Sequence, residues 1–334
     1  MVFDAVPIWV DEQGKYGHPA IERALRGWAM SAPMRALAEA SGWDWPDDSD
    51  TLTLLDRLAE LSDDWDFRRS RERNFIESLA ITEVNGRQIP DSLILDAARA
   101  FGMVDATVVT RRKFSHLVVL SGLVRACVNR THHAAELING GLTVGKVVAL
   151  GAHRKLAGAE PEQARKAGLG DLTDEAEVIL AATRLAFGLG APLRTEESCP
   201  VPDHEQPGKF HAASAYHQWP FVEVVIAPSS EPMNRRANTA DQLRYWADVV
   251  GLGSEHNVLI LTTQLYTQYQ HMETIRVLGL ERDCGVYSCG VDVVTALLPG
   301  RPFSGRDYLQ EIRSFLRAAP VLLRAAYEAA EQTG

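Results

Sequence analysis

The chain has 334 residues, of which 46% are hydrophobic and 23% charged, so it can bury one large core or two modest ones. Its formal net charge of −10 argues against a general nucleic-acid-binding or anionic-membrane-binding surface. No apolar run approaches the roughly 20 residues of a membrane span, and the first residues lack the basic and apolar parts of a signal peptide. We therefore expect a cytoplasmic globular protein with no membrane or nucleic-acid partner.

Residues 1 to about 105 are predicted to form a helical N-terminal region. Apolar residues recur at helical spacing over 19–37 and 51–61, and aspartates at 47, 48 and 50 are suited to cap the second of these helices. A further helix is expected over 90–101, ending at Gly102.

From about residue 106 the pattern changes to alternating strands and helices. Short apolar runs predict strands, and periodic segments between them predict helices. The expected strands are 116–120, 146–150, 222–227 and 258–261, with another beginning near 286, and the clearest helices are 173–189, 240–250 and 304–332. This alternation predicts an α/β fold over 106–334: a Rossmann-like, doubly wound and mainly parallel sheet. Within the last helix, Pro320 is expected to cause a break or kink.

The segment 191–220 is rich in proline and is predicted to form a long lid-like insertion over the sheet edge, or an ordered surface excursion without a role. It carries His204, His211 and His217, but these histidines show no metal-ligand spacing. The four cysteines form no C-x-x-C pair. We therefore expect reduced, mostly buried thiols and no metal site.

Polar residues follow several of the predicted strands. In a parallel sheet such residues gather at the carboxyl edge, where ligands bind. Glycine allows close approach of a ligand, and a helix start offers free N–H groups to an anion. The predicted ligand-binding residues are Ser121, Gly122, Arg125, Arg130, Gly151, Asn238, Thr239, Thr263, Gln264, Tyr266 and Gln270.

Two residues in these loops are candidates for catalysis. His153 titrates near neutral pH and is suited to act as an acid or base, and a surface histidine without a role is the alternative. Glu175 either contacts the ligand or caps its helix together with Thr173. The chain contains no dinucleotide-binding glycine motif, no P-loop, no G-x-S-x-G elbow and no H-E-x-x-H, so the enzyme classes that carry these motifs are not indicated.

The order of these motifs over about 115–316 resembles the YdcF/SanA-like family of bacterial α/β proteins. Ser121-Gly122 stands at the first strand end, Glu175 in the acidic helix start, Asn238-Thr239 in the third loop, and 263–266 after the last of these strands. The chain departs from the family's His-Met-Pro-Arg, because Thr267 and Gln270 replace the histidine and the arginine. The resemblance implies a nucleotide-like ligand, with S-adenosylmethionine as the implied cofactor.

From these observations we expect a group-transfer enzyme that binds a nucleotide-like small molecule at the carboxyl edge. A phosphoryl or sugar-phosphate hydrolase or transferase, with Arg125 and Arg130 as phosphate ligands, is one alternative. A non-catalytic ligand sensor or assembly protein is another. The sequence leaves open whether the chain forms a homo-oligomer.

Overall fold

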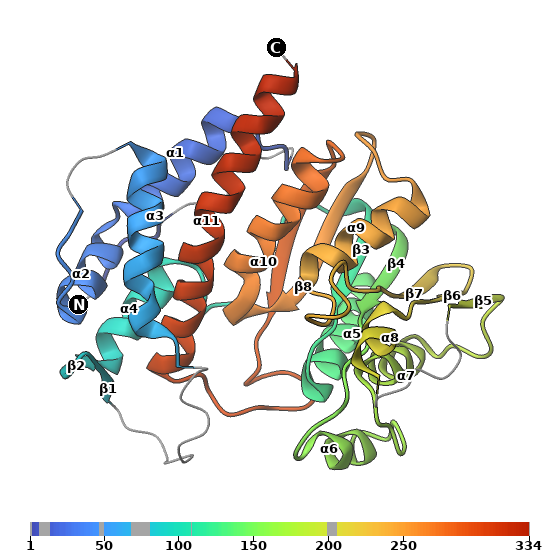
Figure 1. The fold of residues 1–334 in the computed structure, drawn as a ribbon. Coiled ribbons are helices and arrows are strands. Elements are labelled where there is room, and N and C mark those ends of the chain that lie inside the picture. Colours follow the sequence, from blue (N-terminus) through green and yellow to red (C-terminus); the bar gives the residue numbers. More distant parts are fainter. Residues whose placement is uncertain are drawn as a thin grey trace.

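The computed structural model describes residues 2–6, 14–46, 50–67, 81–107, 109–198 and 206–333. A sheet of seven strands in the order β5-β6-β7-β4-β3-β8-β9 forms the centre (Figure 1). Five of these strands are parallel: β3 (Lys113–Leu120), β4 (Thr143–Gly151), β7 (Val222–Ile226), β8 (Asn257–Thr263) and β9 (Gly285–Val291). The prediction of an α/β fold with a mainly parallel, Rossmann-like sheet is confirmed.

The parallel strands are buried on both faces, and their side chains alternate between two cores. Val118 of β3 pairs with Val148 of β4 and Ile260 of β8, and it belongs to the larger core. Its neighbours Leu117 and Val119 point to the opposite face and belong to the second core. This double burial explains why the strands read as continuous apolar runs in the sequence.

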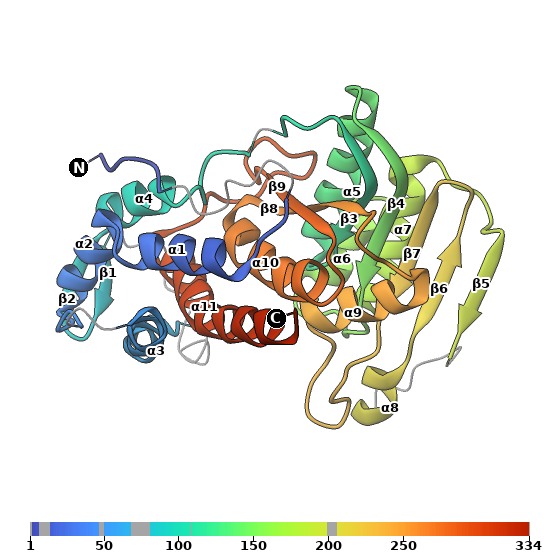
Figure 2. The same ribbon diagram turned by 90° about the horizontal axis from the view of Figure 1, so that it is seen from above.

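Helices cover both faces of the sheet (Figure 2). One face carries α5 (Val124–Asn139), α6 (Glu160–Lys166) and α7 (Glu175–Phe187). The other carries α9 (Thr239–Val250) and, after the short turn η2 (Gln264–Tyr266), α10 (Thr267–Thr274), which continues as the π-helical turn η3 (Ile275–Leu280). The result is a three-layer sandwich.

The segment 191–220 differs from the predicted lid. Its described parts contain β5 (Arg194–Glu197), α8 (Pro207–Ala212) and β6 (Ala215–Gln218). Because the backbone of β6 pairs antiparallel with the free edge of β7, and β5 pairs with β6, these strands extend the sheet instead of covering it. His211 and His217 belong to this extension, whereas Cys199 and His204 lie outside the described residues.

The N-terminal region packs beside the sheet, against the long helix α11 (Gly305–Thr333). It comprises α1 (His18–Ala29), α2 (Ala32–Ser41), α3 (Thr51–Leu61), η1 (Ser62–Trp65), β1 (Ile81–Val84), β2 (Arg87–Pro90) and α4 (Asp91–Ala100). The single helical stretch expected over 19–37 is in fact two helices. The β1–β2 hairpin was not predicted, although its Asn85-Gly86 turn, with positive φ at both residues, is a strong hairpin signal.

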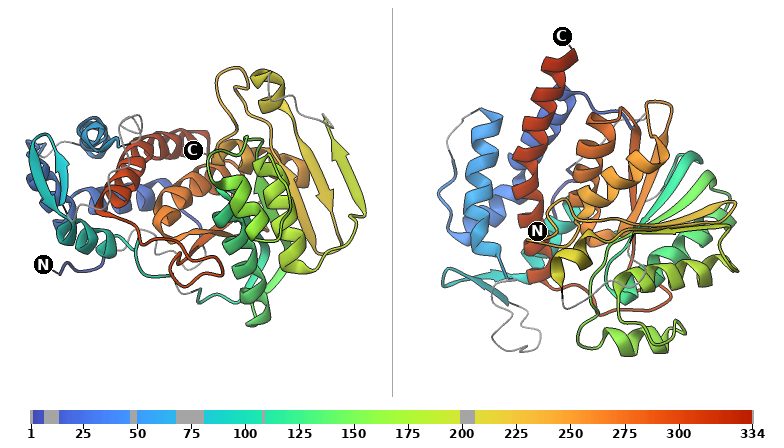
Figure 3. Two further views of the ribbon diagram at one scale, coloured as in Figure 1. Left: turned by 90° about the horizontal axis from the view of Figure 1, so that it is seen from below. Right: turned by 45° about the vertical axis from the view of Figure 1, so that its right-hand side comes forward.

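Helix α11 lies between the N-terminal helices and α10 (Figure 3). Of the break or kink expected at Pro320, the break is wrong, because the helix continues through it to Thr333, and the kink stays a prediction. One apolar face of α11, including Leu309, Ile312 and Leu316, belongs to the same core as the N-terminal helices. Tertiary packing of this face therefore outweighs the backbone hydrogen bond that the proline removes. Among the described helices, none has the length and apolar character needed to cross a membrane.

Candidate functional site

The order in which the chain adds strands to the sheet reverses between the parallel strands β3 and β8. From β3 the chain adds β4 and then β7 on one side, and it later places β8 and β9 on the other side. The carboxyl ends of these two neighbouring strands, at Leu120 and Thr263, therefore flank a topological switch point. Ligands of doubly wound sheets bind at such points because the connecting loops diverge there.

The guanidinium of Arg130 occupies this switch point. Arg130 lies on α5 and is only 2% exposed. Its Nη1 donates to the carbonyl oxygens of Leu120 (2.7 Å) and Ser121 (2.8 Å), and its Nε and Nη2 donate to Oγ1 of Thr263 (3.2 and 3.0 Å). All these partners are neutral, and no aspartate or glutamate of the described residues forms an ion pair with Arg130. Burial lowers the pKa of Arg130 from its usual value, and the nearby Glu175 carboxylate opposes this effect only in part, without forming an ion pair with Arg130.

Gly122 lies beside this guanidinium. A β-carbon at position 122 would stand 3.6 Å from Nη1 and 3.9 Å from Nη2 of Arg130. The missing side chain therefore leaves room next to the charge, and Gly122 is itself partly exposed. This is the role expected of a glycine at a strand end, where a ligand must approach closely.

Arg125 is on the first turn of the same helix. Its Nη1 would be 3.0 Å from a β-carbon on Gly300, so its side chain runs beside the loop that follows β9. Within the described part of the chain it forms no hydrogen bond or ion pair. Arg125 thus provides a second, more accessible cation on the helix that carries Arg130.

A buried network of charges joins the ends of β3 and β4. The hydroxyl of Ser121 donates to Glu175 at 2.6 Å, and Nε of Arg154 donates to the other oxygen of that carboxylate at 2.5 Å. The terminal nitrogens of Arg154 pair with both oxygens of Glu160 at 2.7 Å. Burial alone would raise the pKa of Glu160, but the hydrogen bonds from Arg154 and the N–H of Ala157 outweigh it and hold that pKa low.

His153 and Asp174 form a second pair next to this network. Nδ1 of His153 is 3.2 Å from Oδ1 of Asp174, which also caps α7 by accepting from the N–H of Ala176 at 2.6 Å. Oδ2 of Asp174 is buried and has no hydrogen-bond partner among the described residues. Such a carboxylate favours the tautomer with the proton on Nδ1, which leaves Nε2 of His153 able to accept a proton.

The start of α9 reaches the same network through Arg236. Nη1 of this arginine, whose side chain is 54% exposed, lies 3.5 Å from the Glu175 carboxylate. Asn238 is the N-cap of α9: its side chain accepts from the N–H of Asp241, and Asp241 accepts in return from the N–H of Asn238. Thr239 is the first residue of the helix. Asn238 is thus engaged in helix capping.

Four other predicted residues have contacts within the protein. Gly151 is buried, and a β-carbon there would lie 2.8 Å from Cγ2 of Ile179, so close packing of α7 requires the glycine. Gln264 bonds to the carbonyl of Gly102 and to Thr107, which ties the N-terminal region to the sheet edge. Tyr266 stacks edge-on against Phe303, and Gln270 accepts a hydrogen bond from Thr262.

The structure therefore brings Ser121, Gly122, Arg130, Thr263, His153 and Glu175 to two adjoining places on one edge. Sequence reasoning assigned no role to Arg154, Asp174, Glu160 or Arg236. The only local signal for Glu160 was its place in the first turn of a short helix. No group of three or more histidine, cysteine, aspartate or glutamate side chains in the described ranges is arranged to hold a metal ion.

Residues 12–102 match the family model of the Rv3785 N-terminal domain. The whole chain is similar to the mycobacterial proteins "Uncharacterized protein Mb3814" of Mycobacterium bovis and "Uncharacterized protein Rv3785" of Mycobacterium tuberculosis. With each it is 27% identical over 331 residues, which cover 92% of this chain and 91% of the relative. No solved structure matches it.

These comparisons overturn the resemblance to the YdcF/SanA-like family. The matching family model and relatives are of the Rv3785 type, and none is a YdcF/SanA-like protein. Strand-end residues such as Ser-Gly and Asn-Thr recur in many doubly wound sheets because the fold demands small and capping residues there. The relatives' names state no ligand or activity, so the site has to be interpreted from its own chemistry.

Proposed function

We propose that this protein binds a small molecule through an anionic group at the switch point between β3 and β8, and that it catalyses group transfer at the adjoining ends of β3 and β4. The single observation that supports this most is Arg130, whose buried guanidinium has only neutral partners. A buried guanidinium with a carboxylate nearby but no direct ion pair is costly, and a phosphate or carboxylate group of a ligand would offset that cost.

Access to the guanidinium supports the same proposal. Gly122 leaves room beside Nη1 and Nη2 of Arg130, and Arg125 lies five residues earlier on α5, with no hydrogen bond or ion pair among the described residues. Two arginines on α5 are suited to a ligand with more than one anionic oxygen, such as a nucleotide or a sugar phosphate. S-adenosylmethionine was implied only by the family resemblance, so it enters the experiment below as one ligand among several.

For the chemical step, we assign His153 as the general acid or base. Asp174 orients its Nδ1, and the free Nε2 would exchange a proton with the reacting group. Glu175 holds the hydroxyl of Ser121 and is itself held by Arg154. This arrangement positions Ser121 as a hydrogen-bond donor or acceptor towards the reacting part of the ligand.

The binding step is tested by calorimetry and thermal shift with inorganic phosphate, AMP, ATP, glucose 6-phosphate and S-adenosylmethionine, each compared with an uncharged relative such as adenosine or glucose. At least one anionic compound should raise the melting temperature by mass action, and its uncharged relative should not. Arg130→Gln and Gly122→Val should each weaken the binding of that compound at least tenfold. Arg165→Gln, which removes an exposed arginine on α6, is the matched control.

Two results would overturn the proposal: binding of none of the phosphate compounds or of S-adenosylmethionine, or unchanged affinity in a folded Arg130→Gln and in Gly122→Val. Gly122→Val provides a second test, because its side chain would fill the space beside Nη1 and Nη2 of Arg130 while leaving the arginine in place. Once a turned-over ligand is known, His153→Asn should reduce turnover by about 100-fold or more, the range expected for loss of a general acid or base. Unchanged turnover would remove His153 from the mechanism.

A further inference from the structure

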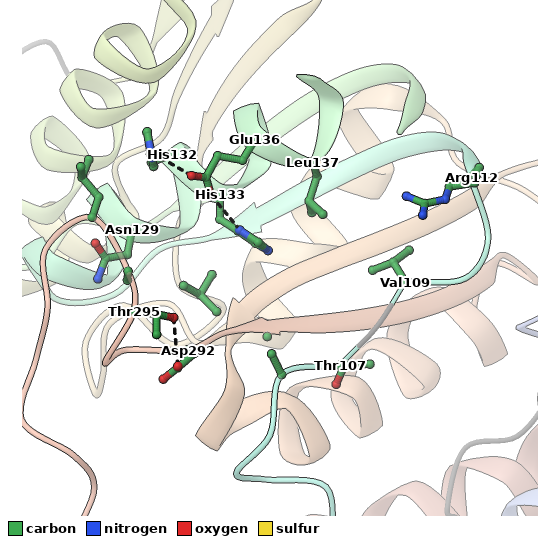
Figure 4. A pocket seen from close by; sticks show the side chains of 15 residues that line it. Thr107, Val109, Arg112, Asn129, His132, His133, Glu136, Leu137, Asp292 and Thr295 are labelled. Carbon is green, nitrogen blue, oxygen red and sulfur yellow. Dashed lines mark hydrogen bonds and ion pairs between the residues drawn. The ribbon is translucent and has the colours of Figure 1, made fainter. Parts of the chain in front are cut away.

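A cavity of about 430 Å³ lies beside the switch point, on the face of the sheet that carries α5 (Figure 4), and its lining includes Val291, the strand partner of Thr263. Its walls come from three places: the middle and end of α5, the extended connection before β3, and the end of β9 with the residues that follow it. This volume is in the range of small-molecule sites. None of the residues assigned above to ligand binding or catalysis lines it.

Helix α5 packs over β3 and β8 and contacts β9 less extensively. Among the described residues, the connection near Val109 and the loop 292–298 rather than a second helix line the remaining space over β9, and the cavity lies there. Apolar side chains form much of the lining, including Leu137, Val291 and Ala296. Extended segments fill less space over a sheet than a helix does. The apolar side chains beneath them are therefore less closely packed and accessible to a small molecule.

The charged groups around the cavity differ in whether they have hydrogen-bond or ion-pair partners within the protein. Glu136 is held by two histidines of its own helix, His132 at 3.2 Å and His133 at 3.1 Å. Asp292 accepts from the N–H of Val294 (2.9 Å) and from the hydroxyl of Thr295 (3.0 Å). Both carboxylates therefore have their hydrogen-bond donors inside the protein, as the dashed lines in Figure 4 show.

Arg112 is different. Its side chain lines the opposite wall, and in the described ranges it forms no hydrogen bond or ion pair. It is thus the lining cation whose hydrogen-bonding capacity remains open to a ligand. A guanidinium of this kind recognises a carboxylate with two parallel hydrogen bonds.

We propose that this cavity binds a small amphipathic carboxylic acid, with its apolar body against Leu137, Val291 and Ala296 and its carboxylate on Arg112. The site is separate from the one in the proposed function, so neither depends on the other. The histidines beside Glu136 report on occupancy, because their rings border the space that the ligand would enter.

The experiment uses the full chain with ¹³C-labelled histidine, whose ring signals are followed by NMR. The signals of His132 and His133 are assigned with His132→Asn and His133→Asn. The protein is titrated with benzoate and hexanoate, and separately with benzamide and hexanamide, which have the same apolar bodies without the charge. We expect saturable shifts of His132 or His133 with at least one acid and much weaker shifts with its amide.

Two variants test the assignment of the groups. Arg112→Gln should weaken binding of the carboxylic acid at least fivefold. Lys113→Gln, which removes the neighbouring positive charge outside the cavity, should leave the affinity for the acid unchanged. Ala296→Phe fills the apolar part and should abolish the shifts. The proposal is overturned if neither acid gives saturable shifts, if amides bind as well as acids, if both charge variants weaken binding equally, or if the folded Ala296→Phe binds normally.

Discussion

The hydroxyl of Thr263, at the end of β8, accepts hydrogen bonds from both Nε and Nη2 of Arg130 on α5. These two residues are separated by 133 positions in the chain. The contact joins the two strands of the switch point through one side chain, because the same guanidinium also holds the carbonyl oxygens of Leu120 and Ser121. The charge of Arg130 is thereby fixed at the switch point.

Replacing this hydroxyl by a methyl group should destabilise the protein. Thr263→Val keeps the shape of the side chain but leaves two N–H groups of a buried guanidinium without an acceptor. We expect the free energy of unfolding to fall by about 1–3 kcal/mol, the cost of unsatisfied buried polar groups. Thr263→Ser retains the hydroxyl and should lose less than about 1 kcal/mol. Urea denaturation measures both, and equal losses would show that the methyl group matters rather than the hydrogen bonds.

A side chain at Gly151 should disturb the packing of α7 on the sheet. In Gly151→Ala the new carbon would lie 2.8 Å from Cγ2 of Ile179 and 3.0 Å from Cδ1 of Ile226. Overpacking of this kind costs about 1–3 kcal/mol. Gly190→Ala is the matched control, because a β-carbon there meets nothing within 4 Å. Thermal unfolding should show a clear loss for Gly151→Ala only, and a similar effect of the two variants would contradict the packing argument.

Two arginines of α11 should differ in their effect on stability. Arg313 is 12% exposed and pairs with Asp66, which is 11% exposed, at 3.0 Å. Arg324 pairs with Asp56, and both side chains are more than 40% exposed. Arg313→Met removes a mostly buried guanidinium from its pair with Asp66 and should cost clearly more than Arg324→Met, which should cost less than about 1 kcal/mol. Equal urea midpoints for the two variants would rule out this ranking.

Acid should destabilise the protein through two buried histidines. Burial lowers the pKa of His271 to about 3; for His116 burial, followed by repulsion from His256, lowers it to about 4. Because the unfolded chain binds these protons near pH 6.5 and the folded chain does not, stability is full above that pH and falls as the pH decreases towards 4.

Each such histidine contributes a slope of about 1.4 kcal/mol per pH unit within this window. His271→Gln should therefore show a shallower loss of unfolding free energy between pH 6 and 4.5 than the unmodified protein, whatever its stability at pH 7. Urea denaturation at a series of pH values measures the slope. Parallel slopes for the two proteins would exclude His271 as a source of acid sensitivity.

Much of the α/β fold could be predicted because its signals are local. The runs that became β3, β4, β7 and β8 are apolar and rich in β-branched residues, as strands buried on both faces must be. The predicted bounds were mostly too short, because polar residues such as Lys113 and Thr143 at the strand starts still pair with each other. The 191–220 segment was misjudged since its short polar strands only acquire their partner, the edge of β7, in the folded sheet.

The features of the candidate site likewise divide into those set by local sequence and those set by tertiary contacts. By itself, the sequence determined that polar and small residues such as Ser121, Gly122 and Glu175 follow the strands, because a residue's place after a strand is a local property. Only the tertiary structure decided that Arg130 reaches Thr263, that Arg154 bridges Glu160 and Glu175, and that Gln264 bonds to Thr107. Those contacts depend on which side chains of distant segments become neighbours after the strands have paired, and burial then decides which charges keep a partner and which, like Arg130, do not.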